Sequence, residues 1–222
     1  PTIKKLMFND SYGLTQAVLN GTKTMTRRIG EKYLTELIKG HETDFTITSQ
    51  RACPKHLVVE SPQLPHGICL WLGTKYRLGE VIAVAQSYET LANSGYLDKM
   101  VVPANNPVKC EFKKEYCNPG WSNKMFVRPD LMPHQIQITD IKIERLQDIS
   151  DEDCWKEGII IKTVGDFGTY AGYGYGERRA SSLDETFSTP RAAFASLIDR
   201  ISGKGTWQSN PIVVAYSFKL IK

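Results

Sequence analysis

Apolar residues along the chain fall mainly into short runs whose spacing is typical of β-strands. Residues 3–8 alternate, with apolar side chains on both faces, and residues 81–86 form an almost unbroken apolar run. Residues 135–146 carry four isoleucines, and residues 212–220 form a last apolar run. Alternation favours half-buried strands, whereas unbroken apolar runs favour strands that are buried on both faces. We therefore expect these four stretches to be strands of one barrel.

Three segments with helical spacing of apolar residues are bounded by residues that begin or end helices. The first ends at Gly21, because glycine enters the left-handed conformation of a helix end without steric cost. The second begins at Ser150, whose hydroxyl can cap backbone N–H groups, and stops at Gly158. The third begins at Pro190, since proline is tolerated in a first helical turn, and ends at Gly203. Short strands with few helices suit a small barrel with helices packed outside it.

Two long stretches show neither the alternation of a strand nor the spacing of a helix. Residues 93–121 contain several prolines and asparagines, and residues 162–190 are rich in glycine, tyrosine and serine. We interpret both as loop insertions in a single domain that covers residues 1–222, because no repeat or domain boundary is visible. Within the second stretch, residues 170–179 could stack bases and contact phosphates, could act as a lid, or could be a disordered loop.

The composition is ordinary for a globular chain, with a mild excess of positive charge. Hydrophobic residues make up 41% and charged residues 23% of the sequence, and the net charge is +4. This balance permits a nucleic-acid or nucleotide partner without requiring one. The sequence has no apolar run long enough to span a bilayer and no basic-then-apolar secretory segment. We expect a cytoplasmic protein with no membrane partner, and no sequence feature indicates an oligomeric state.

Five cysteines form an odd set without the spacing of a disulfide framework, which favours free thiols. Four residues nevertheless form two pairs that could bind zinc: Cys53, His56, His66 and Cys69. Four nitrogen and sulfur ligands are the right number for a structural zinc ion. The order of the pairs is unusual, however, and Cys69 lies in a strand-like run, where cysteine is commonly buried as a small apolar residue. We expect no cofactor and no metal requirement.

The most informative stretch is Asn20–Arg28, where the first helix ends and a basic strand begins. Thr26 and Arg28 should share one face of this strand, because successive side chains point to opposite faces. Lys23 joins them if the chain is still turning at positions 23–25. An ammonium, a hydroxyl and a guanidinium would then converge on one anionic or polar ligand. The alternative is a solvated, basic hairpin end.

The motif of residues 21–28, Gly-x-Lys-x-x-Thr-x-Arg, resembles that of the ASCH domain family, a branch of the PUA-like superfamily. Three further segments resemble the family in the expected order: residues 76–82, 138–159 and 207–218. The resemblance implies an α+β fold, a small mixed β-barrel of the PUA-like/ASCH type with peripheral helices. The chain resembles bacterial and phage ASCH-domain proteins.

The resemblance also implies a protein that binds RNA, a nucleotide or a modified nucleoside in a cleft at this turn. The implied ligand-binding residues are Gly21, Arg27, Arg28, Gln86 and Tyr88. The last two belong to a departure from the family, since Ala-Gln-Ser-Tyr at residues 85–88 replaces the Arg-Glu-Thr-Trp of many members. Neutral groups thereby replace an ion pair, and a smaller ring replaces an aromatic stacker. This departure predicts an altered ligand pocket.

One group of ASCH-like proteins hydrolyses the acetyl amide on the exocyclic amine of modified cytidine. Similarity to this group implies a catalytic set of Lys23, Thr26 and Glu157. The Thr26 hydroxyl would be the nucleophile, and such a hydroxyl needs a base to remove its proton. Lys23 can be that base if burial or a second cation lowers its pKa, while Glu157 orients the ammonium or relays a proton.

Three interpretations of the function therefore stay open. The chain is a binding protein, an amidohydrolase that deacylates acetylated cytidine, or an accessory or structural protein of phage type. In the first, Glu157 is a solvated residue of the last helical turn, and Lys23 and Thr26 bind only phosphate.

Overall fold

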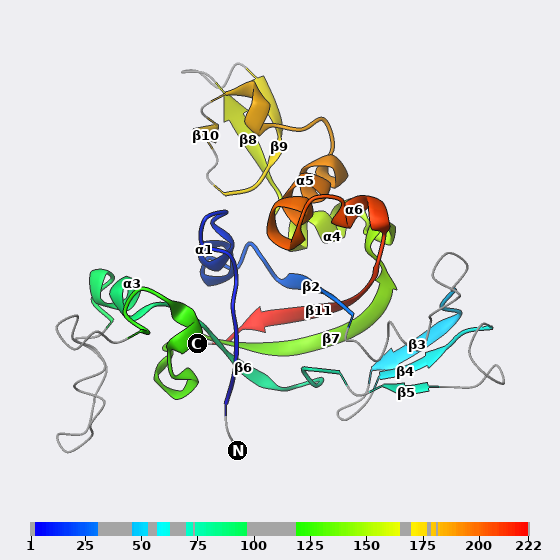
Figure 1. Cartoon of the computed structure of the whole chain (residues 1–222), viewed down its shortest axis with the longest axis horizontal. Helices are drawn as coiled ribbons and strands as arrows, with labels where there is room; N and C mark the ends of the chain where they lie inside the picture. The colour runs from blue at the N-terminus through cyan, green and yellow to red at the C-terminus, as the bar shows by residue number, and fades with distance from the viewer. Residues whose placement is uncertain are drawn as a thin grey trace.

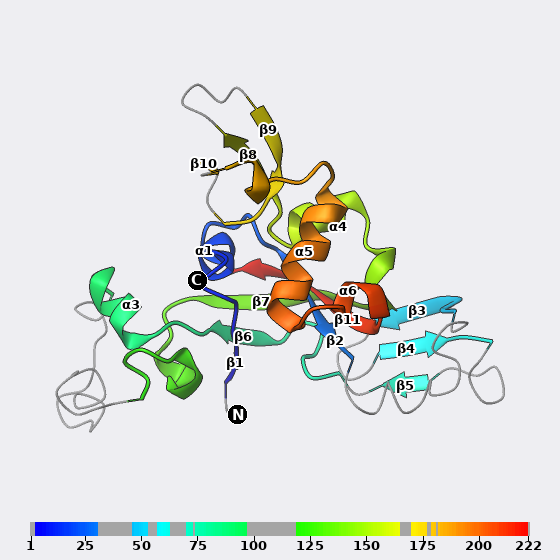
Figure 2. The same cartoon turned by 45° about the horizontal axis from the view of Figure 1, so that its top comes forward.

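The chain forms a central five-stranded sheet, two peripheral three-stranded sheets and several short helices (Figures 1 and 2). The structure is a computed structural model, and it describes residues 3–30, 46–52, 57–62, 70–72, 74–96, 119–164, 170–176, 179–180 and 182–221. All four candidate zinc ligands lie outside these ranges. Mixed sheets with accompanying helices place the described part of the chain in the α+β class.

The central sheet contains all four of the strand stretches predicted from the sequence. Its strands, in spatial order, are β1 (Lys4–Leu6), β6 (Val81–Val84), β7 (Gln135–Arg145), β11 (Ile212–Leu220) and β2 (Met25–Ile29). Strand β1 pairs parallel with β6, and the other neighbouring pairs are antiparallel. The long strand β7 follows a pronounced arc, so the sheet is curved (Figure 1). The prediction that these stretches share one sheet is confirmed.

The curved sheet is not closed by backbone pairing. Strands β1 and β2 are its edges, and within the described residues no backbone ladder joins them. A side chain reaches across the opening instead: Nη2 of Arg28 donates a hydrogen bond of 2.8 Å to the carbonyl oxygen of Met7, the residue after β1. The described strands therefore form an open sheet where the sequence predicts a barrel, and the opening lies beside the basic motif.

Apolar side chains from the central sheet and its flanking segments form the main core. Its largest fully buried members include Tyr76, Ile82, Ile136, Ile138, Ile143 and Tyr216. Two ring contacts join distant parts of the chain. The ring of Tyr76 meets that of Tyr216 edge-on at 5.2 Å between centroids, and Phe8 meets Phe218 at 5.8 Å. Such aromatic pairs stabilise beyond simple burial, so they fix the segments around Phe8 and Tyr76 against β11.

Four helices lie on one side of the central sheet (Figure 2). They are α1 (Leu14–Leu19), α4 (Asp151–Lys156), α5 (Pro190–Ser202) and α6 (Thr206–Ser209). Helix α3 (Tyr88–Asn93) lies at one end, and short 3-10 turns occur at η5 (Lys124–Phe126), η6 (Pro129–Leu131), η7 (Leu146–Asp148) and η8 (Leu183–Glu185). The predicted helix starts at Ser150 and Pro190 are confirmed. No helix in the described ranges combines the length and hydropathy needed to cross a membrane.

The glycine-rich stretch predicted as a long loop is partly sheet. Strands β8 (Ile160–Val164), β9 (Tyr170–Gly174) and β10 (Arg179–Ala180) form one of the peripheral sheets, so the loop prediction for 162–190 is wrong at these residues. Glycine permits close packing here, since a Cβ on Gly172 would lie 2.7 Å from the Cβ of Thr186. The glycines also remove the alternation of side chains on which strand prediction depends.

The other peripheral sheet has the order β3 (Ser49–Ala52), β4 (Leu57–Glu60) and β5 (Leu70–Leu72). Both of its strand pairings are antiparallel, and β3 contacts β7 of the central sheet. Most of the insertion predicted at 93–121, from 97 to 118, lies outside the described residues.

Ile138 offers a test of the main core. Its side chain is 1% exposed on β7, whereas that of Ile161 on β8 is 54% exposed. We expect Ile138→Ala to lower the free energy of unfolding by about 2–4 kcal/mol, because it removes buried methyl groups and leaves a cavity. The same change at Ile161 should alter it by less than about 0.5 kcal/mol. Urea denaturation measures both, and equal effects would contradict the core position of Ile138.

Candidate functional site

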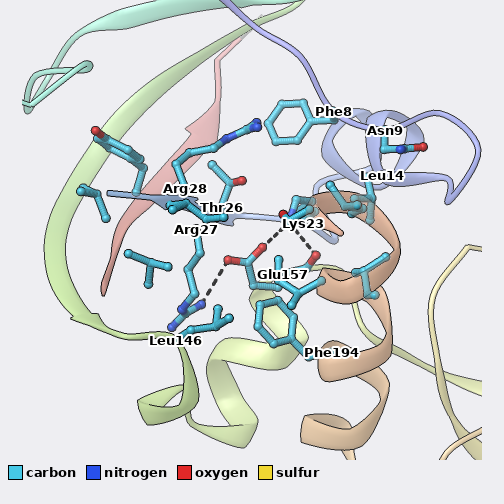
Figure 3. A pocket seen from close by; sticks show the side chains of 18 of the residues that line it. Phe8, Asn9, Leu14, Lys23, Thr26, Arg27, Arg28, Leu146, Glu157 and Phe194 are labelled. Carbon is cyan, nitrogen blue, oxygen red and sulfur yellow. Dashed lines mark hydrogen bonds and ion pairs between the residues drawn. The ribbon is translucent and has the colours of Figure 1, made fainter. Parts of the chain in front are cut away.

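A cavity of about 490 Å³ lies at the opening of the central sheet, between β2, the segment that follows β1, and helix α5 (Figure 3). Its polar lining comes from Asn9, Lys23, Thr26, Arg27, Arg28, Lys75, Glu157 and Ser202. Helix α5 contributes an apolar wall of Phe194, Leu197, Ile198 and Ile201. The basic motif therefore borders a partly open cavity, at the place where the sequence predicts a cleft.

The side chains of the motif on strand β2 point to two opposite faces. Strand β2 pairs with β11 so that Thr26, Arg27 and Arg28 stand opposite Tyr216, Ala215 and Val214. Alternation then places Thr26 and Arg28 on one face and Arg27 on the other. Figure 3 shows this division, with Arg28 extending toward Phe8 and Arg27 extending toward Glu157. The prediction that Thr26 and Arg28 share a face is confirmed.

Lys23 and Glu157 form a buried ion pair at the base of the cavity. Nζ of Lys23 donates hydrogen bonds of 2.6 Å to Oε2 and to the backbone carbonyl oxygen of Glu157. The two side chains are only 2% and 5% exposed. The prediction that these residues meet is confirmed, and Glu157 is not the solvated residue of the alternative interpretation.

The C-terminal end of α4 explains why these distant residues meet. The last carbonyl groups of a helix have no partner within the helix, and a cation there is favoured by the helix dipole. Here the N–H of Thr24 donates a hydrogen bond of 2.8 Å to the carbonyl oxygen of Lys156, and Nζ of Lys23 donates to the carbonyl oxygen of Glu157. Gly158, with φ of 95°, ends the helix and lies against Lys23, which a Cβ at Gly158 would approach to 3.6 Å. The turn at residues 23–24 thus completes the helix end.

Arg27 is the centre of a second set of ion pairs. Its guanidinium donates to Glu144 on β7 at 2.6 Å, and to Asp153 at 2.7 Å and Glu157 at 3.1 Å on α4 and its C-terminal end. The side chain is 1% exposed. Burial lowers the pKa of Arg27, but the carboxylates of Glu157 and Glu144 outweigh burial and raise it. Arg27 therefore stays charged and holds α4 against the sheet. It also lines the cavity, and its role as a ligand contact stays a prediction.

Burial lowers the pKa of Lys23 below its ordinary value of 10.5. The carboxylate of Glu157 opposes this effect, while the charges of Arg28 and Arg27 add to it. A lowered pKa makes release of the Lys23 proton easier, which is the direction that general-base catalysis requires. The hydroxyl of Thr26, which lines the same cavity, has no hydrogen-bond partner among the described residues.

The ring of Phe8 lies close to two cations that line the cavity, Lys23 and Arg28. Nζ of Lys23 lies 6.0 Å, and the guanidinium carbon of Arg28 lies 5.9 Å, from the centre of its ring. Cations within about 6 Å of a ring centre are attracted to its face. Nε of Arg28 is buried and has no hydrogen-bond partner within the described ranges. The described residues therefore leave one hydrogen bond of Arg28 unmade.

Three of the residues predicted to bind ligand lie away from the cavity. Gly21, with φ of 71°, follows the end of α1 and is exposed. Gln86 is buried, and its Oε1 lies 2.6 Å from Nδ1 of His134. Tyr88 is also buried, and its hydroxyl accepts a hydrogen bond of 3.0 Å from the backbone N–H of Arg128. None of the three lines the cavity, so their contacts support packing and turns.

The sequence reasoning missed the residues that form the cavity wall. Phe8 lies in the first predicted strand stretch, and Phe194, Leu197 and Ile201 lie in the predicted helix that begins at Pro190, so neither pattern indicated a cavity. The apolar face of this helix continues as far as Ile201, whose side chain is 38% exposed. An apolar helix face that extends beyond the core can border a ligand site.

Within the described ranges, no group of three or more histidine, cysteine, aspartate or glutamate side chains is placed to hold a metal ion. Comparisons with protein-family models, curated proteins and solved structures find no match to this chain. The resemblance to the ASCH family therefore stays a prediction from the sequence motifs.

Asp153 provides a test of the ion pairs that hold α4. Burial raises its pKa, but hydrogen bonds from Lys142, Lys156 and Arg27 outweigh burial and lower the pKa to about 2. Because this value lies below the ordinary 3.8, the stabilisation is present above that pH and is lost as the pH falls toward 2. We expect Asp153→Asn to lower the free energy of unfolding by about 2 kcal/mol at neutral pH.

Denaturation of both proteins at several pH values measures this effect. The difference between wild type and Asp153→Asn should shrink as the pH falls from about 4 to about 2, because the wild-type carboxyl group becomes protonated. Asp151→Asn, at an exposed position of the same helix, should cost about 0.5 kcal/mol or less. A difference that does not depend on pH would contradict the role given to the Asp153 carboxylate.

Proposed function

We propose that the chain is an ASCH-type, PUA-like protein that binds a nucleoside, a nucleotide or RNA in the cavity beside β2. The observation that carries the proposal is the convergence of Lys23, Thr26 and Arg28 on one cavity. These are the three side chains of the motif that resembles the ASCH family. Their convergence favours a ligand site over a purely structural role for the motif.

The chemistry of the cavity suits such a ligand. The cations and the Thr26 hydroxyl can contact polar edges of a base or sugar, and the buried ring of Phe8 lies behind Lys23 and Arg28. The apolar wall of α5 excludes water from the opposite side. A volume of about 490 Å³ also falls within the range of roughly 300–1,000 Å³ typical of small-molecule sites.

The open, curved sheet supports the finer assignment of the fold. A small barrel that is open at one point leaves a cleft at its edge, and the cavity occupies this position between β2 and Met7. We assign the structure to the PUA-like type on this arrangement together with the four sequence segments that resemble the family.

Phe8→Leu tests the binding function. The change keeps an apolar side chain but removes the ring beside which Lys23 and Arg28 lie, so we expect the affinity for a bound nucleoside to fall about two- to fivefold, the scale of one cation–π contact. Phe126→Leu is the matched control, because Phe126 on η5 is 56% exposed and does not line the cavity. Thermal shift with a panel of nucleosides and short RNAs identifies a ligand, and calorimetry measures its affinity. No binding to any member would contradict the proposal.

We further propose amide hydrolysis on acylated cytidine as a second candidate function. The lowered pKa of Lys23 and the free hydroxyl of Thr26, within one cavity, favour it. Neutral Lys23 takes the proton of the hydroxyl as Thr26 Oγ1 attacks the amide carbonyl. The same proton then passes to the leaving exocyclic amine, which releases cytidine and leaves an acyl ester on Thr26. Water hydrolyses the ester, and Glu157 keeps the amine of Lys23 in place.

Incubation with acetylated cytidine tests this candidate. We expect Thr26→Ala to abolish release of cytidine, Thr26→Ser to retain part of it, and Thr22→Ala, at an exposed position outside the cavity, to leave it unchanged. The rate should rise with pH as Lys23 loses its proton and should level off below the ordinary lysine value of 10.5. Binding without turnover in wild type would leave the binding function and rule out this chemistry.

A further inference from the structure

The charged residues that line the cavity are unevenly balanced. Four are cations, Lys23, Arg27, Arg28 and Lys75, and one is a carboxylate, Glu157. Lys23 is paired with Glu157, and Arg27 is paired with three carboxylates. Within the described part of the chain, neither Arg28 nor Lys75 has a carboxylate partner. The two unpaired charges give the cavity a positive wall.

Arg28 is held in place by neutral groups. Its Nη2 donates to the carbonyl of Met7 at 2.8 Å, and its guanidinium lies over the ring of Phe8. Its buried Nε has no partner among the described residues, and leaving such a donor without an acceptor is costly. An anionic oxygen bound by this guanidinium would balance its charge and supply the acceptor that Nε lacks.

Lys75 supplies the second cation from a separate segment. Its ammonium is exposed and lies 5.5 Å from the centre of the Tyr76 ring. Its backbone carbonyl accepts a hydrogen bond of 2.6 Å from Nζ of Lys4, which fixes the segment to β1. The side chain can therefore turn toward an anion at the cavity mouth while its backbone stays in position.

We propose that Arg28 and Lys75 form a phosphate subsite and that the natural ligand is a mononucleotide. This inference rests on the proposed binding function and specifies its ligand. In this arrangement the phosphate would lie between Arg28 and Lys75, and the nucleoside would occupy the part of the cavity lined by Lys23 and Thr26. A guanidinium donates two parallel hydrogen bonds to phosphate, and the lysine adds a mobile charge.

Calorimetry with cytidine and with cytidine 5′-monophosphate tests the subsite at low salt. Wild type should bind the monophosphate about tenfold more tightly than the nucleoside, the scale of one charge-assisted contact. Arg28→Lys and Lys75→Ala should each reduce this ratio to about threefold or less. Lys75→Ala should keep the nucleoside affinity within about twofold, and an unchanged circular-dichroism spectrum and melting temperature show that each variant is folded. Lys204→Ala, which removes an exposed charge outside the cavity, should keep the full ratio.

Each other outcome overturns a stated part of the argument. Equal affinity of wild type for both ligands overturns the subsite and leaves the proposed binding function. A phosphate preference that survives in both variants overturns the assignment to Arg28 and Lys75. A cytidine oligonucleotide that binds far more tightly than the monophosphate overturns the mononucleotide in favour of RNA. Binding of neither the nucleoside, the monophosphate nor the oligonucleotide overturns the proposed function together with this inference.

Discussion

The buried guanidinium of Arg27 is the interaction on which the site depends. A charge removed from water is tolerated only where carboxylates and hydrogen bonds replace its hydration. Glu144 from β7, and Asp153 and Glu157 from α4 and its end, supply that replacement. Satisfying one side chain therefore brings α4 to a defined place on the sheet. Once α4 is there, Glu157 meets Lys23, and the turn before β2 closes the end of the helix.

Such a network defines geometry more than it adds stability. Replacing buried ion pairs by well-packed apolar groups is often neutral, whereas removing one partner is costly. The network also divides the cations of the motif by function. Lys23 and Arg27 are engaged in holding α4, while Arg28 and the hydroxyl of Thr26 are left to face the cavity. The alternation of β2 makes this division, because neighbouring side chains point to opposite faces.

The sequence predicted those features whose cause is local. Periodicity located the strands of the central sheet, and Ser150 identified the start of a helix through its capping chemistry. Only the family resemblance could join Lys23 to Glu157, since no local pattern connects residues 134 positions apart. The strands around Gly172 were missed because their glycines serve close packing. The burial of the Arg27 side chain was also not predicted. A basic residue in a polar turn is expected to be exposed unless its carboxylate partners are known.

The pairing of β2 with β11 has a consequence for how the protein is made. Met25 stands opposite Ser217, 192 positions later (217 − 25). At usual rates of synthesis, β11 emerges from the ribosome roughly 10–40 s after the basic motif. Until then β2 has no neighbour to set the direction of Thr26 and Arg28, since β11 is the strand it pairs with in the central sheet. During synthesis the chain therefore contains the motif before the cavity has formed. A chain that binds ligand is one in which β11 has already paired with β2.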